Sequence, residues 1–312
     1  MMHQPVLYQE IINALCPRPG GKYVDGTLGA GGHAWGLLFA SEPDGKLLGL
    51  DIDPQAIQIA KNILASYGER VIILQDSYQT IRSHLNRLNW GGVDGIVLDL
   101  GLSSMQLDNP DKGFSFRLEG PLDMRFDPNN SISADFLVNH LSERELANII
   151  YKYGEEPKAN LIARAIVQSR PISTTTQLAD LIARVAGRKS TGIHPATRTF
   201  QALRIMVNQE LDVLQNTLPH LTSCLNADGR LAVISFHSLE DRMVKVFFRQ
   251  ESRGCLCPPR QPVCTCNHTA TIREITKKPI RPSDEEVRVN PRARSARLRV
   301  AERLAIVNIT DQ

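Results

Sequence analysis

The segment YVDGTLGAGGHA, residues 23–34, contains the residues whose types and spacing most clearly suggest chemistry. A short apolar run ends in Asp25, and a glycine-rich turn follows before a helical pattern begins. Such turns let the backbone approach a small ligand closely, and the acid at the strand end adds a negative charge beside it. The first question raised by the sequence is therefore which ligand this turn holds.

Two kinds of ligand compete for the turn. Residues 29–34, GAGGHA, satisfy the dinucleotide pattern G-x-G-x-x-[G/A], and Asp51 follows Gly31 by 20 residues. A carboxylate at Asp25 would repel a pyrophosphate but favour a cation. S-adenosylmethionine is cationic, carries no phosphate, and has ribose hydroxyls that Asp51 can bind. We therefore predict this methyl donor, while an N-cap role for Asp25 is the alternative.

Two further apolar runs also end in polar residues. Asp76 and Tyr78 follow the run RVIILQ, where either side chain could face an adenine ring; helix capping is the alternative for Asp76. Asp99 ends the run VDGIVLD. A carboxylate at that place is either a capping group or a catalytic one.

The elements that must position these residues alternate along the first hundred residues. Short apolar runs (KYVDGTLG, KLLGLDID, RVIILQD and VDGIVLDLG) are separated by helical patterns. This alternation predicts an α/β fold with a mostly parallel, doubly wound sheet. Ligands of such sheets bind at the carboxyl ends of the strands, which is where Asp25, Asp51 and Asp99 are expected.

The alternation of strand and helix patterns ends after the fourth predicted strand. Residues 105–131 form a long pattern rich in Gly, Pro and Asp, and only helical patterns follow. We predict an inserted helical subdomain at 109–195, which leaves 1–108 and 196–312 as one discontinuous α/β domain. Residues 194–225 show one long helical pattern, and DGRLAVISFHS and SARLRVAERLA are predicted to be further strands.

Composition and charge limit the class of protein. The chain has 312 residues, 42% of them hydrophobic and 22% charged, and a net charge of +3, which is typical of a globular protein. It shows neither an apolar run of membrane-spanning length nor a secretion signal, so a cytoplasmic protein without a membrane partner is expected. Residues 270–304 carry ten Lys or Arg against five Asp or Glu. This segment is either an ion-paired strand face or a surface that contacts phosphates.

Four of the six cysteines are clustered, with the spacing C-x-C…C-x-C: Cys255, Cys257, Cys264 and Cys266. Four thiolates suffice for a structural zinc ion, although the spacing within each pair is tighter than usual. Free thiols and disulfides are the alternatives that the sequence leaves open.

Seven motifs occur in order across nearly the whole chain: VDGTLGAGGH, LDLGLSSMQLD, GFSFR, GPLDMR, HPATRTFQALRI, ISFHSLEDR and NPRARSARLRVAER. Together they resemble the RsmH (MraW) family of bacterial 16S ribosomal RNA cytosine-N4 methyltransferases. The resemblance implies a class I S-adenosylmethionine-dependent methyltransferase fold, Rossmann-like, with the helical insertion serving RNA recognition. It also implies a cytosine of the decoding centre as acceptor and 16S ribosomal RNA in the small ribosomal subunit as partner. A homodimer is compatible with the sequence.

The resemblance also implies particular residues. Together with Asp25 and Gly29 from the turn, the expected cofactor residues are Gly31, Gly32, His33, Asp51, Tyr78, Asp99 and Gln106. The family often has Phe in place of Tyr78, and either ring can lie against adenine.

The catalytic and substrate residues are less well marked. Amino methyltransferases carry an S/N/D-P-P-aromatic segment after the fourth strand, but residues 99–104 here, DLGLSS, lack both the prolines and the aromatic ring. Asp99 is our first candidate for accepting the amine hydrogens. The other candidates are Ser103 and His237 for catalysis, and Phe114, Arg125, Arg198 and Asp241 for substrate binding. Phe114 and Phe116 could stack on a base or anchor their loop.

Two other functions remain open at this stage. One is an N-methyltransferase acting on another nucleic acid or on a small molecule. The other is a non-catalytic RNA-binding assembly protein on the same fold. Binding of S-adenosylmethionine distinguishes an enzyme from the non-catalytic assembly protein. The identity of the methylated molecule distinguishes the ribosomal RNA enzyme from another N-methyltransferase.

Overall fold

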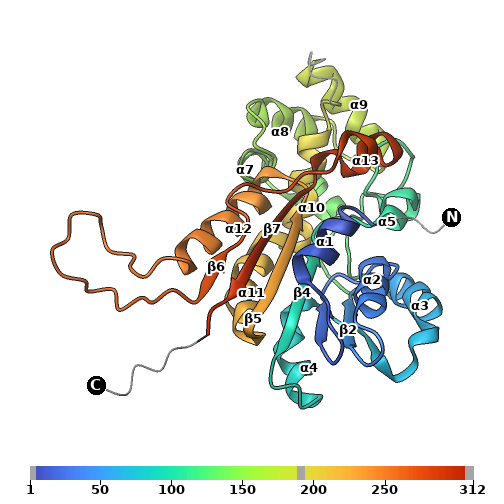
Figure 1. Cartoon of the computed structure of the whole chain (residues 1–312). Coiled ribbons are helices and arrows are strands. Elements are labelled where there is room, and N and C mark those ends of the chain that lie inside the picture. The colour runs from blue at the N-terminus through green and yellow to red at the C-terminus, as the bar shows by residue number, and fades with distance from the viewer. Residues whose placement is uncertain (1–4, 188–193, 306–312) are drawn as a thin grey trace. The chain divides into compact units, whose positions relative to one another are not determined.

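The computed structural model describes residues 5–187 and 194–305. The chain divides into two compact units. The sheet unit comprises Met1–Gly101 and Val213–Gln312, and the helical unit comprises Leu102–Asp212. Figure 1 labels the elements of both units.

In the described part of the sheet unit, seven strands form one sheet in the order β3-β2-β1-β4-β5-β7-β6. The first five strands run parallel to one another, whereas β7 is antiparallel to both β5 and β6. The strands are β1 (Lys22–Asp25), β2 (Lys46–Asp51), β3 (Val71–Gln75), β4 (Val93–Asp99), β5 (Leu225–Ser235), β6 (Ile272–Glu274) and β7 (Arg297–Arg303). The strand order reverses between β1 and β4, so this is the topological switch point at which such sheets bind ligands.

Helices cover both faces of this sheet because successive strand residues point to opposite sides. Tyr23 and Val97 pack with helices α1, α2 and α3, while Val24 and Ile96 pack with α4, α11 and α12. The helices of this unit are α1 (Tyr8–Leu15), α2 (Gly32–Ala40), α3 (Pro54–Ile63), α4 (Ile81–Arg87), α12 (Ser238–Glu251) and α13 (Asp284–Val289), with α11 (Glu210–Cys224) starting just before the unit boundary. Short 3-10 helices are η1 (Ala65–Arg70), η2 (Tyr78–Thr80) and η4 (Pro291–Ser295).

The helical unit contains a core of its own. Its elements are α5 (Ser104–Asp108), η3 (Pro110–Lys112), α6 (Ala134–His140), α7 (Glu143–Gly154), α8 (Ala159–Gln168), α9 (Thr175–Ala186) and α10 (Thr197–Asn208). Capping boxes at Ser103 and Ser142 start α5 and α7 as their sequences suggest. The buried side chains come from most of these helices and from the loop before α6, and include Phe114, Ile150, Ile166, Ile182 and Phe200.

The doubly wound sheet with a helical insertion matches the predicted fold class, but two details differ. The helical unit begins at Leu102 and ends at Asp212, whereas the sequence suggested 109–195. The reason is packing: Phe200, Leu203 and Val207 of α10 belong to the core of the helical unit. The single long helix expected over 194–225 is two helices, because Gln209 adopts a left-handed conformation with φ of 51° and ends α10.

Candidate functional site

Three neighbouring strands of the sheet end in aspartates at one edge. Asp25, Asp51 and Asp99 are the last residues of β1, β2 and β4. Asp25 is level with Gly49 of β2 and Val97 of β4, so both neighbouring carboxylates follow about two residues further along the same edge. The parallel arrangement thus places three acids beside the topological switch point.

The glycine turn between β1 and α2 has the conformation that its composition suggests. Gly29 and Gly31 have φ values of 52° and 86°, which side chains other than glycine rarely adopt. Gly32 begins α2, and a Cβ atom on it would lie only 2.7 Å from the Pro5 ring. Gly29 and Gly31 thus allow the left-handed conformation of the turn, and Gly32 leaves room for Pro5.

His33 follows this turn as the second residue of α2, and its side chain is buried in the protein. The side chain is only 4% exposed, and its Nε2 lies 3.0 Å from the Val6 carbonyl oxygen. Burial lowers the pKa of His33 to about 4, although the Val6 contact opposes this shift. The ring is therefore neutral at pH 7 and holds the amino-terminal segment against α2. A cofactor contact for His33 stays a prediction.

Asp51 is held by the glycine turn itself. Its Oδ2 accepts a hydrogen bond from the Gly29 amide at 2.7 Å, and its Oδ1 accepts one from the Asp53 amide at 2.9 Å. Burial raises the pKa of Asp51, while both amides oppose the shift. A carboxylate has about four acceptor positions, so capacity for a pair of hydroxyl groups remains.

Asp25 and Asp99 are the least satisfied groups at this edge. Asp25 is 1% exposed; its Oδ1 accepts the Thr27 amide at 3.2 Å, while its Oδ2 is buried without a hydrogen-bond partner. Asp99 Oδ1 is likewise buried and without a partner. A buried polar oxygen in that state costs stability unless a ligand completes it.

The electrostatics of the two groups agree with their geometry. Burial raises the pKa of Asp25 to about 7; the Thr27 and Ala34 amides oppose this shift and the Asp51 charge adds to it. Burial raises the pKa of Asp99 to about 8, and the charges of Asp25 and Glu240 add to the shift. A cation bound beside these buried carboxyl groups would stabilise their ionised forms and lower their pKa values. These residues therefore fit a cationic methyl donor.

Two residues that sequence reasoning missed support this edge. The Thr27 hydroxyl accepts the Asp99 amide and so joins the glycine turn to the end of β4. Glu240 is 2% exposed and accepts hydrogen bonds from the Phe236 and His237 amides. The spacing H-x-x-E in FHSLED is a capping-box signal that could have identified Glu240, but no local pattern marks Thr27.

The third strand leads into Asp76 and Tyr78. Asp76 Oδ2 lies 2.8 Å from His84 Nε2, and Oδ1 accepts the Ser77 amide. Burial raises the pKa of Asp76, but these two contacts outweigh it and hold the pKa below its usual value. Asp76 therefore pairs with His84 of α4, while Ser77 is the N-cap of η2. Tyr78 begins η2, half-buried beside Gly26, and remains the better candidate for an adenine contact.

The segment after β5 has a structural role at two positions. His237 is the N-cap of α12: its Nδ1 accepts the Glu240 amide at 3.4 Å, and its Nε2 is buried 3.1 Å from a Glu240 oxygen without hydrogen-bond geometry. Asp241 is 8% exposed and binds Arg299 at 2.7 Å and Arg297 at 3.1 Å. Asp241 thus ties α12 to β7, so we no longer assign it to substrate binding.

In the helical unit, Ser103 and Gln106 serve the start of α5. The Ser103 hydroxyl accepts the Gln106 amide, and the Gln106 side chain accepts the Ser103 amide. This capping box explains both residues locally, and no further role for Ser103 follows from the structure of its unit.

Phe114 and Phe116 of the long loop are anchors of the helical core. Phe114 is 6% exposed, and its ring centroid lies 5.4 Å from that of Phe126. Phe116 stacks on His194 at 4.7 Å and meets Phe200 edge-on at 5.1 Å. Stacking of Phe114 on a base, which the sequence suggested, is incompatible with this burial, because the ring faces are already covered.

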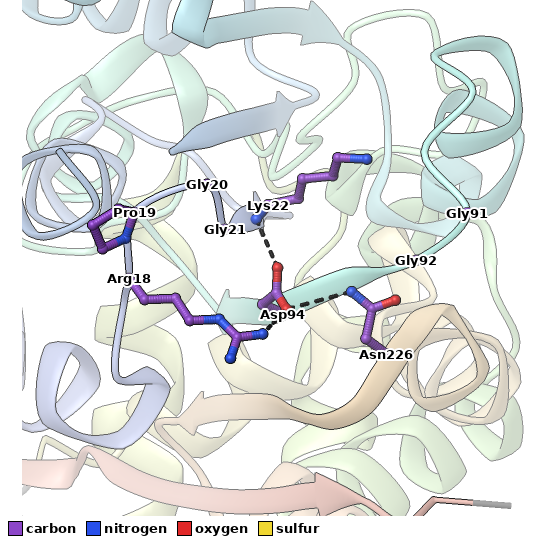
Figure 2. Close-up of a pocket in the computed structure, with 9 residues that line it drawn as sticks. All are labelled: Arg18, Pro19, Gly20, Gly21, Lys22, Gly91, Gly92, Asp94 and Asn226. Atoms are coloured by element: carbon purple, nitrogen blue, oxygen red, sulfur yellow. Dashed lines mark hydrogen bonds and ion pairs between the residues drawn. The ribbon is translucent and has the colours of Figure 1, made fainter. Parts of the chain in front are cut away.

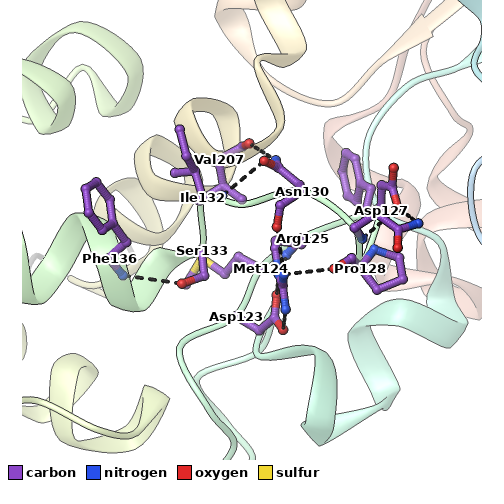
Figure 3. Close-up of polar contacts among 12 residues, drawn as sticks. Asp123, Met124, Arg125, Asp127, Pro128, Asn130, Ile132, Ser133, Phe136 and Val207 are labelled. Carbon is purple, nitrogen blue, oxygen red and sulfur yellow. Dashed lines mark hydrogen bonds and ion pairs between the residues drawn. The ribbon is translucent and has the colours of Figure 1, made fainter.

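Arg125 folds its own loop, as Figure 3 shows. Its guanidinium binds both oxygens of Asp123, at 2.8 and 2.9 Å, and donates to the carbonyl oxygens of Pro128 and Asn130. Because this network engages all three guanidinium nitrogens, the substrate contact predicted for Arg125 is replaced by a structural role. Arg198 differs: its side chain is 46% exposed and donates to the Glu155 carbonyl through Nη1.

We expect Arg125→Ala to destabilise the protein rather than weaken RNA binding. The substitution leaves the Asp123 carboxylate and two carbonyl oxygens without their donor, which costs about 1–3 kcal/mol. Thermal unfolding should show a lower melting temperature. Arg117→Ala, at an exposed position of the same loop, removes the same charge and serves as the control. An unchanged melting temperature combined with weaker RNA binding would contradict this role.

A pocket lies at the opposite edge of the sheet and is separate from this site. Residues at the amino-terminal starts of β1 and β4 line it, and Figure 2 shows Asp94 at its centre. Asp94 binds Arg18 at 2.8 Å and accepts the Lys22 amide at 2.9 Å, with Asn226 at 3.4 Å. The carboxylate of Asp94 is thus already paired within the protein.

Among the described residues, no helix is long and apolar enough to cross a membrane.

The chain is similar to known methyltransferases over nearly its whole length. A profile described as the MraW methylase family matches residues 1–304. A protein of Thermomicrobium roseum named Ribosomal RNA small subunit methyltransferase H is 51% identical over 306 residues, covering 97% of this chain and 94% of that protein. Proteins of the same name are 50% identical in Dehalococcoides mccartyi, covering 97% and 86% of the two chains, and 48% identical in Heliobacterium modesticaldum, covering 97% and 98%.

Proposed function

The chain belongs to the MraW methylase family, and on that premise we propose that it transfers a methyl group from S-adenosylmethionine to the exocyclic N4 of a cytosine in the decoding centre of 16S ribosomal RNA. The names of the relatives support a small-subunit ribosomal RNA as substrate. The observation that carries the proposal is the pair of buried, unpartnered carboxyl oxygens of Asp25 and Asp99 at the switch point of a class I methyltransferase fold.

Each part of the donor matches a residue at this edge. Asp51 retains acceptor capacity for the two ribose hydroxyls. Tyr78, after β3, offers a ring for the adenine. The Oδ2 atom of Asp25 has no hydrogen-bond partner and could pair with a positively charged group of the donor. The glycine turn leaves room for these contacts because Gly29 and Gly31 have no side chains. Gln106 stays a further candidate from the helical unit.

Bound S-adenosylmethionine supplies a methyl carbon made electrophilic by its sulfonium group. The work of the chain is then to align the cytosine amine and to receive the proton that N4 releases. Alignment of reacting groups contributes about 7–11 kcal/mol to such reactions. Asp99 is the proposed acceptor, since its raised pKa of about 8 makes its ionised form a stronger base than an ordinary carboxylate.

The substrate must present its base outside a stack to reach this edge. Arg198, exposed on α10, and the arginine-rich segment 290–304 carry positive charge suited to RNA phosphates. This segment is not wholly a free basic surface, because Arg299 and Arg297 bind Asp241. The proposed substrate places the protein in the cytoplasm, where small ribosomal subunits are assembled.

The proposal is tested by incubating the purified chain with S-adenosylmethionine labelled in the methyl group and small ribosomal subunits from cells that lack this modification. We expect label in 16S RNA at a single cytosine, identified as N4-methylcytosine by mass spectrometry of nuclease fragments. Free 16S RNA, transfer RNA and DNA serve as alternative acceptors in parallel reactions. Label in transfer RNA or DNA alone would identify another N-methyltransferase, whereas label in free 16S RNA alone would keep the proposed RNA but not the assembled subunit as substrate. Donor binding by calorimetry without transfer to any acceptor would favour the assembly protein.

A further inference from the structure

The loop between α12 and β6, residues 252–271, lacks an apolar core. In Figure 1 it extends away from the sheet unit between these two labelled elements. Nearly every side chain from Arg253 to Asn267 is exposed, including Leu256 and Val263 at 42% and 71%. A segment that buries so little apolar surface needs another source of order.

The four clustered cysteines gather at one point of this loop. The sulfur of Cys255 lies 3.5 Å from that of Cys264 and 3.7 Å from that of Cys266. Cys264 lies 3.9 Å from Cys257 and 3.6 Å from Cys266. All four sulfurs lie within 4.8 Å of one another. None of the four residues is buried, which is unusual for cysteines without a ligand.

These separations are those of a tetrahedral metal site. Four sulfurs at about 2.3 Å from a zinc ion stand about 3.8 Å from one another, and the observed separations scatter around this value. A disulfide would bring two sulfurs to about 2.05 Å, far closer than any of these pairs. The third alternative, free thiols, gives no reason for four sulfurs to converge in a loop without an apolar core.

The backbone around the sulfurs is arranged for negative charge. The amides of Leu256, Cys257 and Thr265 point to sulfurs of the cluster, at 3.3, 3.4 and 3.4 Å. Three N–H groups directed at sulfur would stabilise thiolates, the form in which cysteine binds a metal. Each tight C-x-C segment thus supplies at least one amide to a sulfur of the cluster.

From the convergence of four sulfurs at tetrahedral separations, none of them in a buried residue, we propose that Cys255, Cys257, Cys264 and Cys266 bind one structural Zn²⁺ ion. The ion serves as the core of the loop and fixes residues 255–266 between α12 and β6. A site closed by four protein ligands leaves no open position, so the ion takes no part in methyl transfer. Binding requires the deprotonated thiols and releases their protons.

The first test is the metal content of the full-length chain. Protein purified without chelators and with a phosphine reductant should contain about one zinc per chain by elemental analysis. Cys264→Ser and the double variant Cys255→Ser/Cys264→Ser should lose it. Cys16→Ser removes another exposed thiol outside the loop and should keep it. Replacing zinc by Co²⁺ should give the intense visible absorption of a tetrahedral tetrathiolate complex.

A second measurement reports on the loop without depending on activity. Trypsin can cleave after Arg253 and Arg260, which are both exposed. We expect these bonds to resist trypsin in the wild type and to be cut at least tenfold faster after chelation or in Cys264→Ser, while far-ultraviolet circular dichroism shows that the sheet unit remains folded.

Several results would overturn the proposal. One is a protein that neither contains nor takes up zinc and whose four loop thiols react freely with a thiol reagent. Others are a zinc content that Cys264→Ser leaves unchanged, or iron in place of zinc. A disulfide between loop cysteines, found by mass spectrometry under non-reducing conditions, would also overturn it.

Discussion

Asp99→Asn is expected to lower the rate of methyl transfer by about 10²–10⁴-fold, the usual contribution of a positioned proton acceptor. Asparagine has nearly the same shape as aspartate but cannot take the proton that the cytosine amine releases. Single-turnover transfer of labelled methyl to small ribosomal subunits measures the effect. Because burial raises the pKa of Asp99 to about 8, wild-type kcat/KM should rise as pH increases through 7 to 8, and the variant should lose this rise.

The matched control is Asp94→Asn, at the opposite end of the same strand. Asp94 binds Arg18 and the Lys22 amide, away from the proposed site, so its variant should retain near-normal transfer. Near-normal turnover of Asp99→Asn would leave Asp99 with a cofactor-binding or structural role only.

Stability gives an independent readout of the same carboxyl group. Its pKa in the folded protein lies above the usual value of about 4, so the stability that Asp99 contributes falls as pH rises from about 4 to about 8. Asparagine carries no such penalty. Asp99→Asn should therefore melt at an equal or higher temperature than the wild type at pH 8, and the difference should vanish near pH 4. A variant that melts far lower at pH 8 would show that the ionised carboxylate stabilises the fold.

Asp25→Asn is expected to weaken binding of S-adenosylmethionine by about 10–150-fold, corresponding to the roughly 1.5–3 kcal/mol typical of hydrogen bonds to charged groups. The physical reason is that the substitution removes the attraction between the Asp25 carboxylate and the cationic donor. Binding of S-adenosylhomocysteine, whose sulfur is neutral, should weaken less. Calorimetry with both ligands from pH 6 to 9 tests this. Wild-type affinity for the donor should increase with pH as Asp25, with a pKa of about 7, becomes ionised, and the variant should show a flatter dependence.

The two acids also affect each other. The charge of Asp25 adds to the raised pKa of Asp99, so Asp25→Asn should shift the pH profile of methyl transfer toward lower pH. Asp44→Asn, in the turn before β2 where Asp44 accepts the Gly20 amide, is the charge-matched control and should change neither profile. Unchanged affinity for both ligands in Asp25→Asn would assign Asp25 to the helix cap and not to the donor, whereas equal weakening would mean that Asp25 faces the amino group that both ligands share.

Much of the sheet unit could be predicted from the sequence because its signals are local. Apolar runs ending in Asp25, Asp51 and Asp99 identify strands, and parallel strands bring their carboxyl ends to one edge. Gly29 and Gly31 mark a turn with positive φ, as observed. The helical insertion was also recognisable, but its limits were not, because α10 joins its core through Phe200, Leu203 and Val207, whose partners lie far away in the sequence.

The candidate site was predictable in residue type but not in environment. The side chains of Phe114 and Arg125 looked suited to a base or a phosphate, yet one is packed against Phe126 and the other is occupied by Asp123. Asp241 looked like a substrate residue and is paired with Arg299 of β7. In each case the partner that decides the role is supplied by folding.

The sequence by itself therefore determined the order of the elements, the acids at the strand ends and the spacing of the cysteines, since each depends on residues close together in the chain. Only the tertiary structure decided that Asp25 and Asp99 keep a buried oxygen without a partner, and that four sulfurs converge in the loop after α12. The physical reason is that burial, pKa and metal geometry depend on atoms that become neighbours only when distant segments, such as β4 and Glu240 of α12, pack together.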